Sequence, residues 1–278
     1  MSVRAFDAGS YLGRIRHPGD VRLTAAGLER LHRAQVGTIP FENFDVLLGR
    51  GVSLEPEALF AKLVHRPRGG YCFELNGLFL AALQTFGFEA RALLARVHRG
   101  GVPSGRSHQI SLVTVGGREW IADVGFGGPH LPAPLPLEIG PVVTLDGEAF
   151  RLSEGGPYGI MLQILLDGGW QDLYSFDLGH VFAGDIAHGN HYTSTHPDSF
   201  FTRTRVAALP LPGGRVTLLD RTLRRVTADT DEVSELAEGD AYLDALKNQF
   251  GIELDAPYEA LPPLAGHTAR EETVVPFR

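Results

Sequence analysis

The chain has 278 residues, of which 44% are hydrophobic, and this is enough for a full core in one large domain or in two. Its net charge is −8 and its pI is about 5.7; because it also has no basic stripe, a nucleic-acid partner is not expected. The single cysteine excludes an internal disulfide.

The first third of the chain is predicted to be helical. Apolar residues recur at helical spacing in three stretches, 24–35, 56–64 and 72–86. Thr24 is a residue type that caps helix N-termini, Pro56 favours a first helical turn, and Gly87 is a typical C-cap. Pro40 argues against a helix between the first two stretches.

The middle of the chain is predicted to form antiparallel strands. Short β-branched or apolar runs occur at 90–97, 108–115, 119–124, 142–152, 158–166 and 170–176. Gly116-Gly117 and Gly168-Gly169 are expected to be hairpin turns. Evenly spaced strands of this kind indicate a sheet that curls toward a barrel.

The last third is predicted to be mixed. We expect a weak helix over 177–192, strands at 204–209, 215–219 and 224–227, and a helix over 231–250. The proline-rich tail, with prolines at 257, 262, 263 and 276, is expected to be irregular. Domain boundaries are expected near residues 88 and 195.

The cellular compartment is predicted from what the sequence lacks. The first seven residues have no apolar core like that of a signal peptide, and no stretch has the length of a membrane span. A chain with one cysteine also fits a reducing compartment. We therefore expect a cytoplasmic protein without a membrane partner.

The only cysteine, Cys72, lies at the predicted start of the third helix, directly after Arg68-Gly69-Gly70-Tyr71. Free N–H groups and the helix dipole favour an anion at a helix N-terminus, and therefore a thiolate. A thiolate is a nucleophile in acyl-transfer enzymes. A lone cysteine is also often a small buried hydrophobe, and Cys72 alone does not decide between these interpretations.

A cysteine nucleophile needs a base, and the base needs an orienting carboxylate. If Gly116-Gly117 is a hairpin turn, residue 108 pairs near residue 125, so His108 and Asp123 are diagonal neighbours. Such neighbours lie roughly 7–8 Å apart between Cα atoms, within side-chain reach. The hairpin can bring the two side chains together, but it does not show that they face Cys72. Taken singly, a strand histidine is usually structural and an aspartate before glycine usually forms a turn.

Four segments carry a resemblance to a known family: Ile39-Pro40-Phe41-Glu42-Asn43, Arg68-Gly69-Gly70-Tyr71-Cys72-Phe73-Glu74-Leu75-Asn76, His108, and Asp123-Val124-Gly125-Phe126-Gly127-Gly128. In this order they resemble the arylamine N-acetyltransferases over most of the first half of the chain. A weaker likeness continues through Asn190-His191-Tyr192 and residues 194–202. The block that ends in Cys72 is highly specific, whereas little after about residue 205 can be matched.

The resemblance implies an α+β fold on a core similar to cysteine peptidases and transglutaminases. It implies a helical N-terminal domain at 1–88, an antiparallel β-barrel domain at 89–195 and an α/β lid at 196–278. It also implies a catalytic triad of Cys72, His108 and Asp123.

The activity that the resemblance implies is transfer of an acetyl group from acetyl-CoA to an arylamine, arylhydrazine or N-hydroxyarylamine. The chemistry of the residues agrees. An imidazolium at His108, held by Asp123, raises the ionised fraction of the thiol, which then attacks the thioester. An amine next attacks acetyl-Cys72 with help from the histidine, in a ping-pong mechanism. The backbone N–H of Cys72 is one candidate donor to the oxyanion.

Further contacts are implied by position in the family. Phe41, Phe126 and Phe201 match residues that line the acceptor pocket. Gly125, Phe126, Gly127 and Gly128 resemble the segment beside CoA, where glycines allow a close backbone approach. Glu42 and Arg68 are expected to form a buried structural pair.

The expected partners are acetyl-CoA and a small aromatic amine or hydrazine, with no metal, in a monomer or homodimer. Other functions remain open. A cysteine peptidase or amidase, or a macrolactam-forming amide synthase, could use the same triad. A non-enzymatic binding protein with a structural Cys72 predicts no alkylation of the thiol at neutral pH. The block before Cys72 favours the transferase, but the acceptor, the acyl-chain preference and the oligomeric state are not determined.

Overall fold

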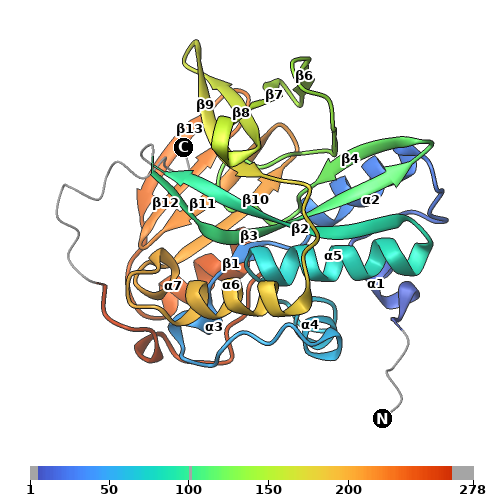
Figure 1. The fold of residues 1–278 in the computed structure, drawn as a ribbon. Helices are drawn as coiled ribbons and strands as arrows, with labels where there is room; N and C mark the ends of the chain where they lie inside the picture. Colours follow the sequence, from blue (N-terminus) through green and yellow to red (C-terminus); the bar gives the residue numbers. More distant parts are fainter. Residues whose placement is uncertain (1–5, 100–101, 265–278) are drawn as a thin grey trace.

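The structure is a computed structural model that describes residues 6–99 and 102–264 (Figure 1). The α-helices are α1 (Ala8–Arg14), α2 (Ala25–Val36), α3 (Phe44–Leu47), α4 (Pro56–Leu63), α5 (Cys72–Phe86), α6 (Ala183–Thr195) and α7 (Asp240–Ala245). Short 3₁₀ turns are η1 (Gly156–Tyr158), η2 (Phe200–Thr202) and η4 (Tyr258–Ala260), and η3 (Leu246–Phe250) is a π-helical turn.

The strands form two antiparallel sheets. The larger sheet has the order β5-β4-β3-β2-β9-β8-β7-β6, and the smaller one has the order β1-β10-β11-β12-β13. The strands of the larger sheet are β2 (Glu89–Arg99), β3 (Val102–Val115), β4 (Arg118–Ala122), β5 (Leu135–Pro136), β6 (Val142–Leu145), β7 (Glu148–Glu154), β8 (Ile160–Leu166) and β9 (Gly169–Phe176). Those of the smaller sheet are β1 (Phe41–Glu42), β10 (Val206–Leu211), β11 (Gly214–Leu219), β12 (Thr222–Val226) and β13 (Asp231–Glu235).

The larger sheet curls until its two ends nearly meet. A bridge between Ile139, just after β5, and Leu152 of β7 links the two ends, and the N–H of Gly140 donates to the carbonyl of Leu152 at 2.9 Å. Leucine, isoleucine and aromatic side chains fill the interior, with Phe150, Ile164 and Tyr174 fully buried. The predicted α+β class and barrel-like sheet are confirmed.

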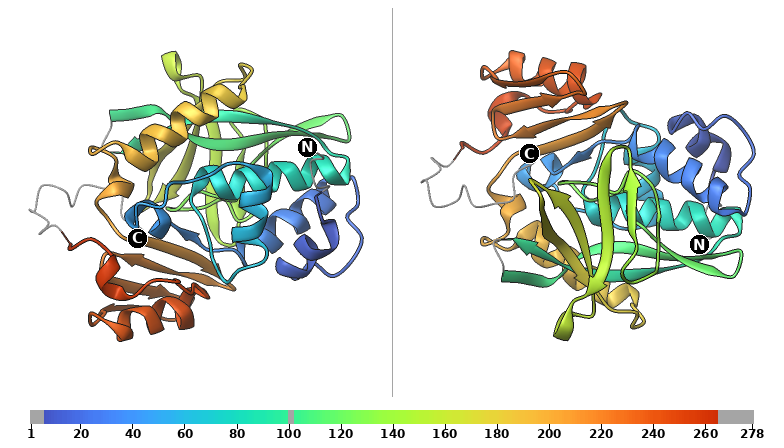
Figure 2. Two further views of the ribbon diagram at one scale, coloured as in Figure 1. Left: turned by 90° about the horizontal axis from the view of Figure 1, so that it is seen from below. Right: turned by 90° about the horizontal axis from the view of Figure 1, so that it is seen from above.

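Helices cover one face of the larger sheet. Helices α5 and α6 both pack against β3, and α4 packs on α5 (Figure 1). The smaller sheet and α7 lie on the other side of the molecule from α1 and α2 (Figure 2). Its strand β1 comes from the first 88 residues and pairs with β10, so the N-terminal segment contributes a strand to the sheet of the C-terminal segment. The boundaries at 88 and 195 stay predictions.

The predicted helix signals act as expected. The hydroxyl of Thr24 accepts the N–H of Gly27 at 3.1 Å and caps α2. Gly87 ends α5 in the left-handed conformation, with φ of 94°, and α5 spans the predicted residues 72–86. The glycine turn at 116–117 is also present and sets the pairing of Ser111 with Ala122.

Two predictions need correction, a strand over 142–152 and a turn at 168–169. The single strand expected over 142–152 is the hairpin of β6 and β7, because Asp146 and Gly147 adopt φ of 50° and 88° and reverse the chain. Asp-Gly is a strong signal for this turn, and the apolar run around it concealed the signal. The turn expected at Gly168-Gly169 is formed instead by Asp167 and Gly168, with φ of 50° and 78°.

The helix predicted over 231–250 is wrong in its first part. Residues 231–235 form β13, which pairs with β12, and Arg224 and Asp231 form an ion pair across the two strands. The helix begins only after Gly239, which has φ of 77°. The weak helix expected over 177–192 likewise begins later, at Ala183. Helix α1 and strand β5 were not predicted, and Pro276 of the tail lies outside the described residues.

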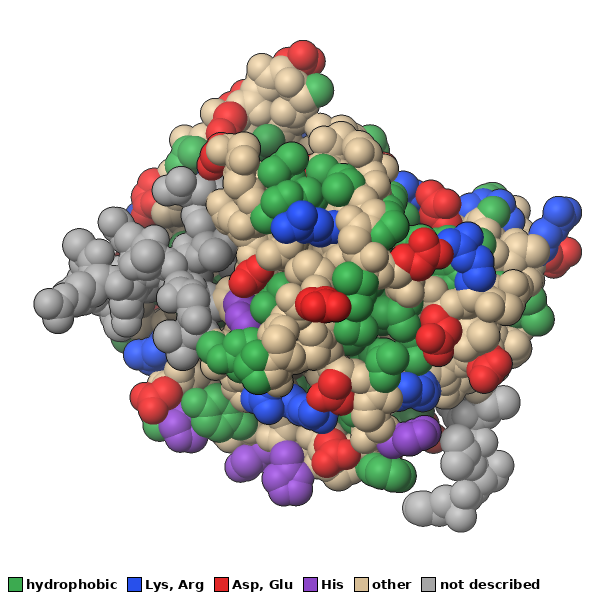
Figure 3. All heavy atoms as spheres, turned by 45° about the horizontal axis from the view of Figure 1, so that its top comes forward, with side chains coloured by type: hydrophobic (Ala, Val, Ile, Leu, Met, Phe, Trp, Pro, Cys, Tyr) green, Lys and Arg blue, Asp and Glu red, His purple; other side chains and the backbone are tan. Residues whose placement is uncertain are grey.

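The charged side chains on the surface are mixed in sign. On the face in Figure 3, basic and acidic side chains are interspersed rather than gathered into a basic stripe. Within residues 6–99 and 102–264, no helix is long and apolar enough to cross a membrane.

Candidate active site

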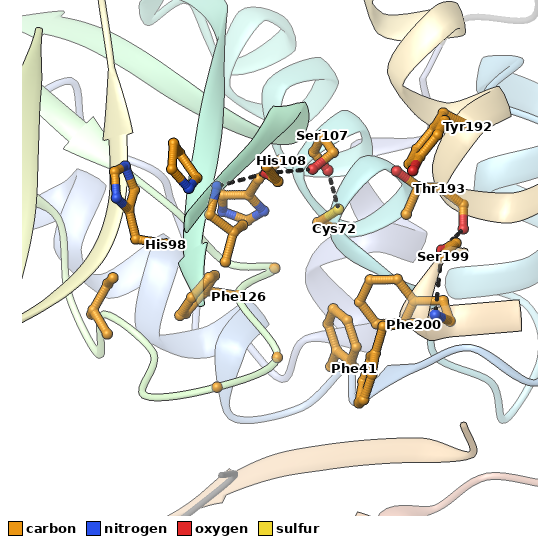
Figure 4. A pocket seen from close by; sticks show the side chains of 18 of the residues that line it. Phe41, Cys72, His98, Ser107, His108, Phe126, Tyr192, Thr193, Ser199 and Phe200 are labelled. Carbon is orange, nitrogen blue, oxygen red and sulfur yellow. Dashed lines mark hydrogen bonds between the residues drawn. The ribbon is translucent and has the colours of Figure 1, made fainter. Parts of the chain in front are cut away.

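The thiol of Cys72 opens into a cavity of about 360 Å³ (Figure 4). Cys72 is the first residue of α5, as predicted from the glycine turn and the apolar run that follows. The residue is buried, with 4% exposed. Its Sγ lies 3.7 Å from the carbonyl oxygen of Ser107 on β3. The cavity therefore lies where the start of α5 meets the barrel-like sheet.

The two glycines before Cys72 are required by close packing. A Cβ on Gly69 would lie 2.0 Å from the carbonyl oxygen of Pro40, and a Cβ on Gly70 would lie 2.7 Å from a carboxylate oxygen of Glu74. The N–H of Gly70 donates to Pro40, and the N–H of Glu42 donates to Gly70. The loop before Cys72 therefore packs closely against β1 and the preceding Pro40.

A buried network of charges supports this loop. Arg68 pairs with Glu42 at 2.8 Å and with Asp45 at 2.9 Å, so the predicted Glu42–Arg68 pair is present. Lys62 pairs with Asp45 at 2.8 Å and with Glu74 at 2.7 Å. The second oxygen of Glu74 accepts the N–H of Tyr71 at 3.0 Å, which ties the network to the first turn of α5.

His108 and Asp123 form a buried pair beside the thiol. Nε2 of His108 lies 2.7 Å from Oδ2 of Asp123. Burial by itself lowers the pKa of His108, but the Asp123 carboxylate and the adjacent Cys72 side chain raise it to about 10. Burial likewise raises the pKa of Asp123, and His108 with the other donors brings it below its usual value. At neutral pH the pair is therefore an imidazolium and a carboxylate.

The structure brings the predicted site residues together from distant parts of the chain. The cavity is lined by Cys72, His108, Gly125, Phe126, Gly127, Gly128, Phe41 and Phe201. Asp123 lies behind His108 and is fully buried. The rings of Phe41 and Phe201 are 5.8 Å apart, and a Cβ on Gly127 would lie 2.7 Å from the ring of Phe41. Over the described residues, no group of three His, Cys, Asp or Glu side chains could hold a metal ion.

Sequence and structure comparisons agree on one family. A family model described as N-acetyltransferase matches residues 24–258. An arylamine N-acetyltransferase / N-hydroxyarylamine O-acetyltransferase from Salmonella typhimurium is 40% identical over 82% of this chain and 83% of the relative. An arylamine N-acetyltransferase from Mycolicibacterium smegmatis is 38% identical over 90% of this chain and 93% of the relative. The chain belongs to the arylamine N-acetyltransferase family.

Solved structures of arylamine N-acetyltransferases share the fold over most of this chain. That of the Salmonella typhimurium enzyme has a TM-score of 0.85 at 36% identity, covering 90% of this chain and 92% of that one. A Mycobacterium marinum arylamine N-acetyltransferase in complex with CoA has a TM-score of 0.84 at 37% identity, covering 88% of this chain and 93% of that one.

Sequence reasoning missed several residues of this acetyltransferase site. The ring of Tyr174 on β9 packs against His108 with centroids 5.1 Å apart, beside the predicted Phe126, whose ring centroid is 5.2 Å from the imidazole. Nε2 of His32 on α2 lies 3.1 Å from the carbonyl oxygen of Asp123, and burial lowers the pKa of His32 to about 4, so the ring is neutral. Tyr174 and His32 are far from the motifs along the chain, and no local signal marks them.

We expect Gly69→Ala to destabilise this acetyltransferase by about 2 kcal/mol or more, because the new Cβ would clash with the backbone carbonyl of Pro40. Gly13→Ala is the matched control: its Cβ meets nothing within 4 Å, and alanine is favoured over glycine within α1 by up to about 1 kcal/mol. Denaturant unfolding of both variants measures the difference. An unfolding free energy of Gly69→Ala equal to that of the wild type would contradict this account of the loop.

Proposed function

We propose that this acetyltransferase moves an acetyl group from acetyl-CoA to arylamines, arylhydrazines or N-hydroxyarylamines, through acetyl-Cys72. The observation that carries the proposal is the buried His108–Asp123 pair, 2.7 Å apart, beside the only thiol of the chain. The names of the relatives and the CoA complex of a similar structure support the donor and the class of acceptor.

In the first half-reaction, the Cys72 thiolate attacks the carbonyl carbon of the acetyl thioester. Because Nε2 of His108 is bonded to Asp123, Nδ1 is the ring nitrogen left for the thiol and the leaving group. The imidazolium charge stabilises the thiolate, and the backbone N–H of Cys72 at the start of α5 stabilises the oxyanion. The C–S bond to CoA then breaks, and the departing CoA thiolate takes the proton of His108.

In the second half-reaction, the amine nitrogen attacks the carbonyl carbon of acetyl-Cys72. His108, now neutral, accepts the proton that the nitrogen loses. The C–S bond to Cys72 breaks, the acetylated amine leaves, and the imidazolium–thiolate pair is restored. Asp123 keeps its negative charge throughout and stabilises the imidazolium each time it forms.

The lining of the cavity suits a neutral aromatic acceptor. Phe41, Phe126, Phe200 and Phe201 present apolar surface to the space in front of the thiol. Such a wall favours a flat aromatic ring in front of the thiol.

We assign the CoA side of the cavity to Gly125, Phe126, Gly127 and Gly128. These residues follow Asp123 directly and border the same space as the thiol. A Cβ on Gly125 would lie 2.7 Å from the amide nitrogen of Asn76 and 3.1 Å from Cys72 Cα, so glycine is needed for this loop to lie beside α5. The absence of side chains at three of the four positions also leaves room for the pantetheine arm.

Incubation with acetyl-CoA and no acceptor is expected to leave one acetyl group on the protein, located on Cys72. Intact mass measurement followed by peptide mapping detects it, and addition of an arylamine should remove it. Cys72→Ser is the control and should take up no label. The chain has only two lysines, Lys62 and Lys247. Acetylation of either lysine in place of Cys72 would contradict the covalent mechanism.

A further inference from the structure

We propose that Asn76 is a positioning residue for the acetyl transfer: it holds the Asp123 carboxylate toward His108 and fixes the nucleophile's helix against the β3–β4 hairpin. This inference rests on the proposed function of Cys72, His108 and Asp123. Asn76 is fully buried on α5, one turn after Cys72. Its amide nitrogen donates to Oδ1 of Asp123 at 2.9 Å.

The orientation of the Asn76 amide is determined by its surroundings. The nitrogen side meets two acceptors, Oδ1 of Asp123 and the carbonyl oxygen of Gln109 at 2.7 Å. The oxygen side accepts the N–H of Val124 at 3.0 Å. A flipped amide would place its oxygen against two other oxygens and its N–H₂ group against an N–H. Only one orientation therefore satisfies all three contacts, and it always presents a donor to the carboxylate.

The two carboxylate oxygens of Asp123 have different hydrogen-bond partners. Oδ1 accepts from Asn76 and from the N–H of Gly125 at 3.0 Å, while Oδ2 faces His108. Rotation of the carboxylate would break both bonds to Oδ1. The donors also stabilise the ionised form in a site from which water is excluded, which a buried carboxylate requires if it is to stay charged.

Asn76 also couples the two ends of the triad. It lies four residues after Cys72, so both side chains lie on the same face of α5. Through Gln109 it is bonded to β3 next to His108, and through Val124 it is bonded to the chain next to Asp123. A shift of α5 along the hairpin would break these bonds.

The test is the pH dependence of Cys72 alkylation by iodoacetamide, together with kcat/KM for acetyl transfer to an arylamine. In Asn76→Ala we expect the pH midpoint of alkylation to rise and kcat/KM to fall between about 10-fold and about 150-fold, the range for a hydrogen bond to a charged group. Asn76→Asp keeps the side-chain shape but places a second carboxylate against that of Asp123. The added negative charge near the thiol disfavours the thiolate, so the pH midpoint of alkylation should rise further.

Gln35→Ala is the matched control. Gln35 is also fully buried and its amide donates to the backbone of α5, at Leu75 with 2.9 Å, but it does not touch the triad. Its removal should lower the melting temperature and leave the alkylation midpoint unchanged. If both Asn76 variants keep the wild-type midpoint while Asp123→Asn shifts it, the role of Asn76 is overturned and the triad stands. If Asp123→Asn does not shift the midpoint either, the proposed function itself fails.

Discussion

His108→Gln is expected to lower the rate of Cys72 alkylation at neutral pH by about 30-fold, because an unassisted thiol with a pKa of about 8.5 is only about 3% ionised at pH 7. In the wild type the imidazolium beside the thiol persists, since the pKa of His108 is raised to about 10. Acetyl transfer should fall further, by about 10³-fold or more, because the variant also loses the group that gives and takes the proton.

The pH profile separates this explanation from a general loss of structure. His108 keeps its proton until pH approaches its raised pKa of about 10, so the wild-type alkylation rate should depend less on pH across the neutral range than the rate of His108→Gln. The rate of His108→Gln should climb over the same range. His65→Gln, an exposed histidine outside the cavity, is the control and should behave as wild type. A level profile in His108→Gln would mean that another group ionises the thiol.

Asp123→Asn is expected to reduce acetyl transfer by at least about 100-fold while the fold is retained. In a serine-protease triad the equivalent substitution costs about 10⁴-fold. The Asp123 carboxylate is the main group that raises the pKa of His108 against the effect of burial. Without this charge, burial dominates and the pKa of His108 falls, so the imidazole becomes neutral at pH 7 and the thiolate loses its partner.

Alkylation and turnover of Asp123→Asn should be measured over the same pH range. The midpoint of alkylation should move to higher pH, because the thiol then ionises without a neighbouring positive charge. Asp146→Asn provides a control with the same change in net charge, at an exposed turn residue whose φ of 50° asparagine tolerates. Turnover and a pH profile like those of the wild type in Asp123→Asn would remove Asp123 from the mechanism and leave it as an ordinary turn residue.

The local parts of this site could be predicted from the sequence. The start and end of α5 follow from a glycine loop, an apolar run and Gly87, all of which act within a few residues. The pairing of β3 with β4 follows from the turn at 116–117, which brings His108 near Asp123. The resemblance to a family named Phe41, Phe201 and the Gly125–Gly128 loop, all of which line the cavity, and the comparisons confirmed the family.

Only the tertiary structure decided which residues from distant segments contact one another. The hairpin did not show that its His108–Asp123 pair faces Cys72; this depends on α5 packing on β3, where Cys72 contacts Ser107, 35 residues further along the chain. Asn76 sits inside the cysteine motif, yet its partners Gln109 and Val124 belong to other segments. Residues 231–235 became a strand because the open edge of β12 offered them hydrogen bonds. Sequence patterns act through neighbours along the chain, whereas strand partners and buried polar contacts are selected by what the completed fold places beside them.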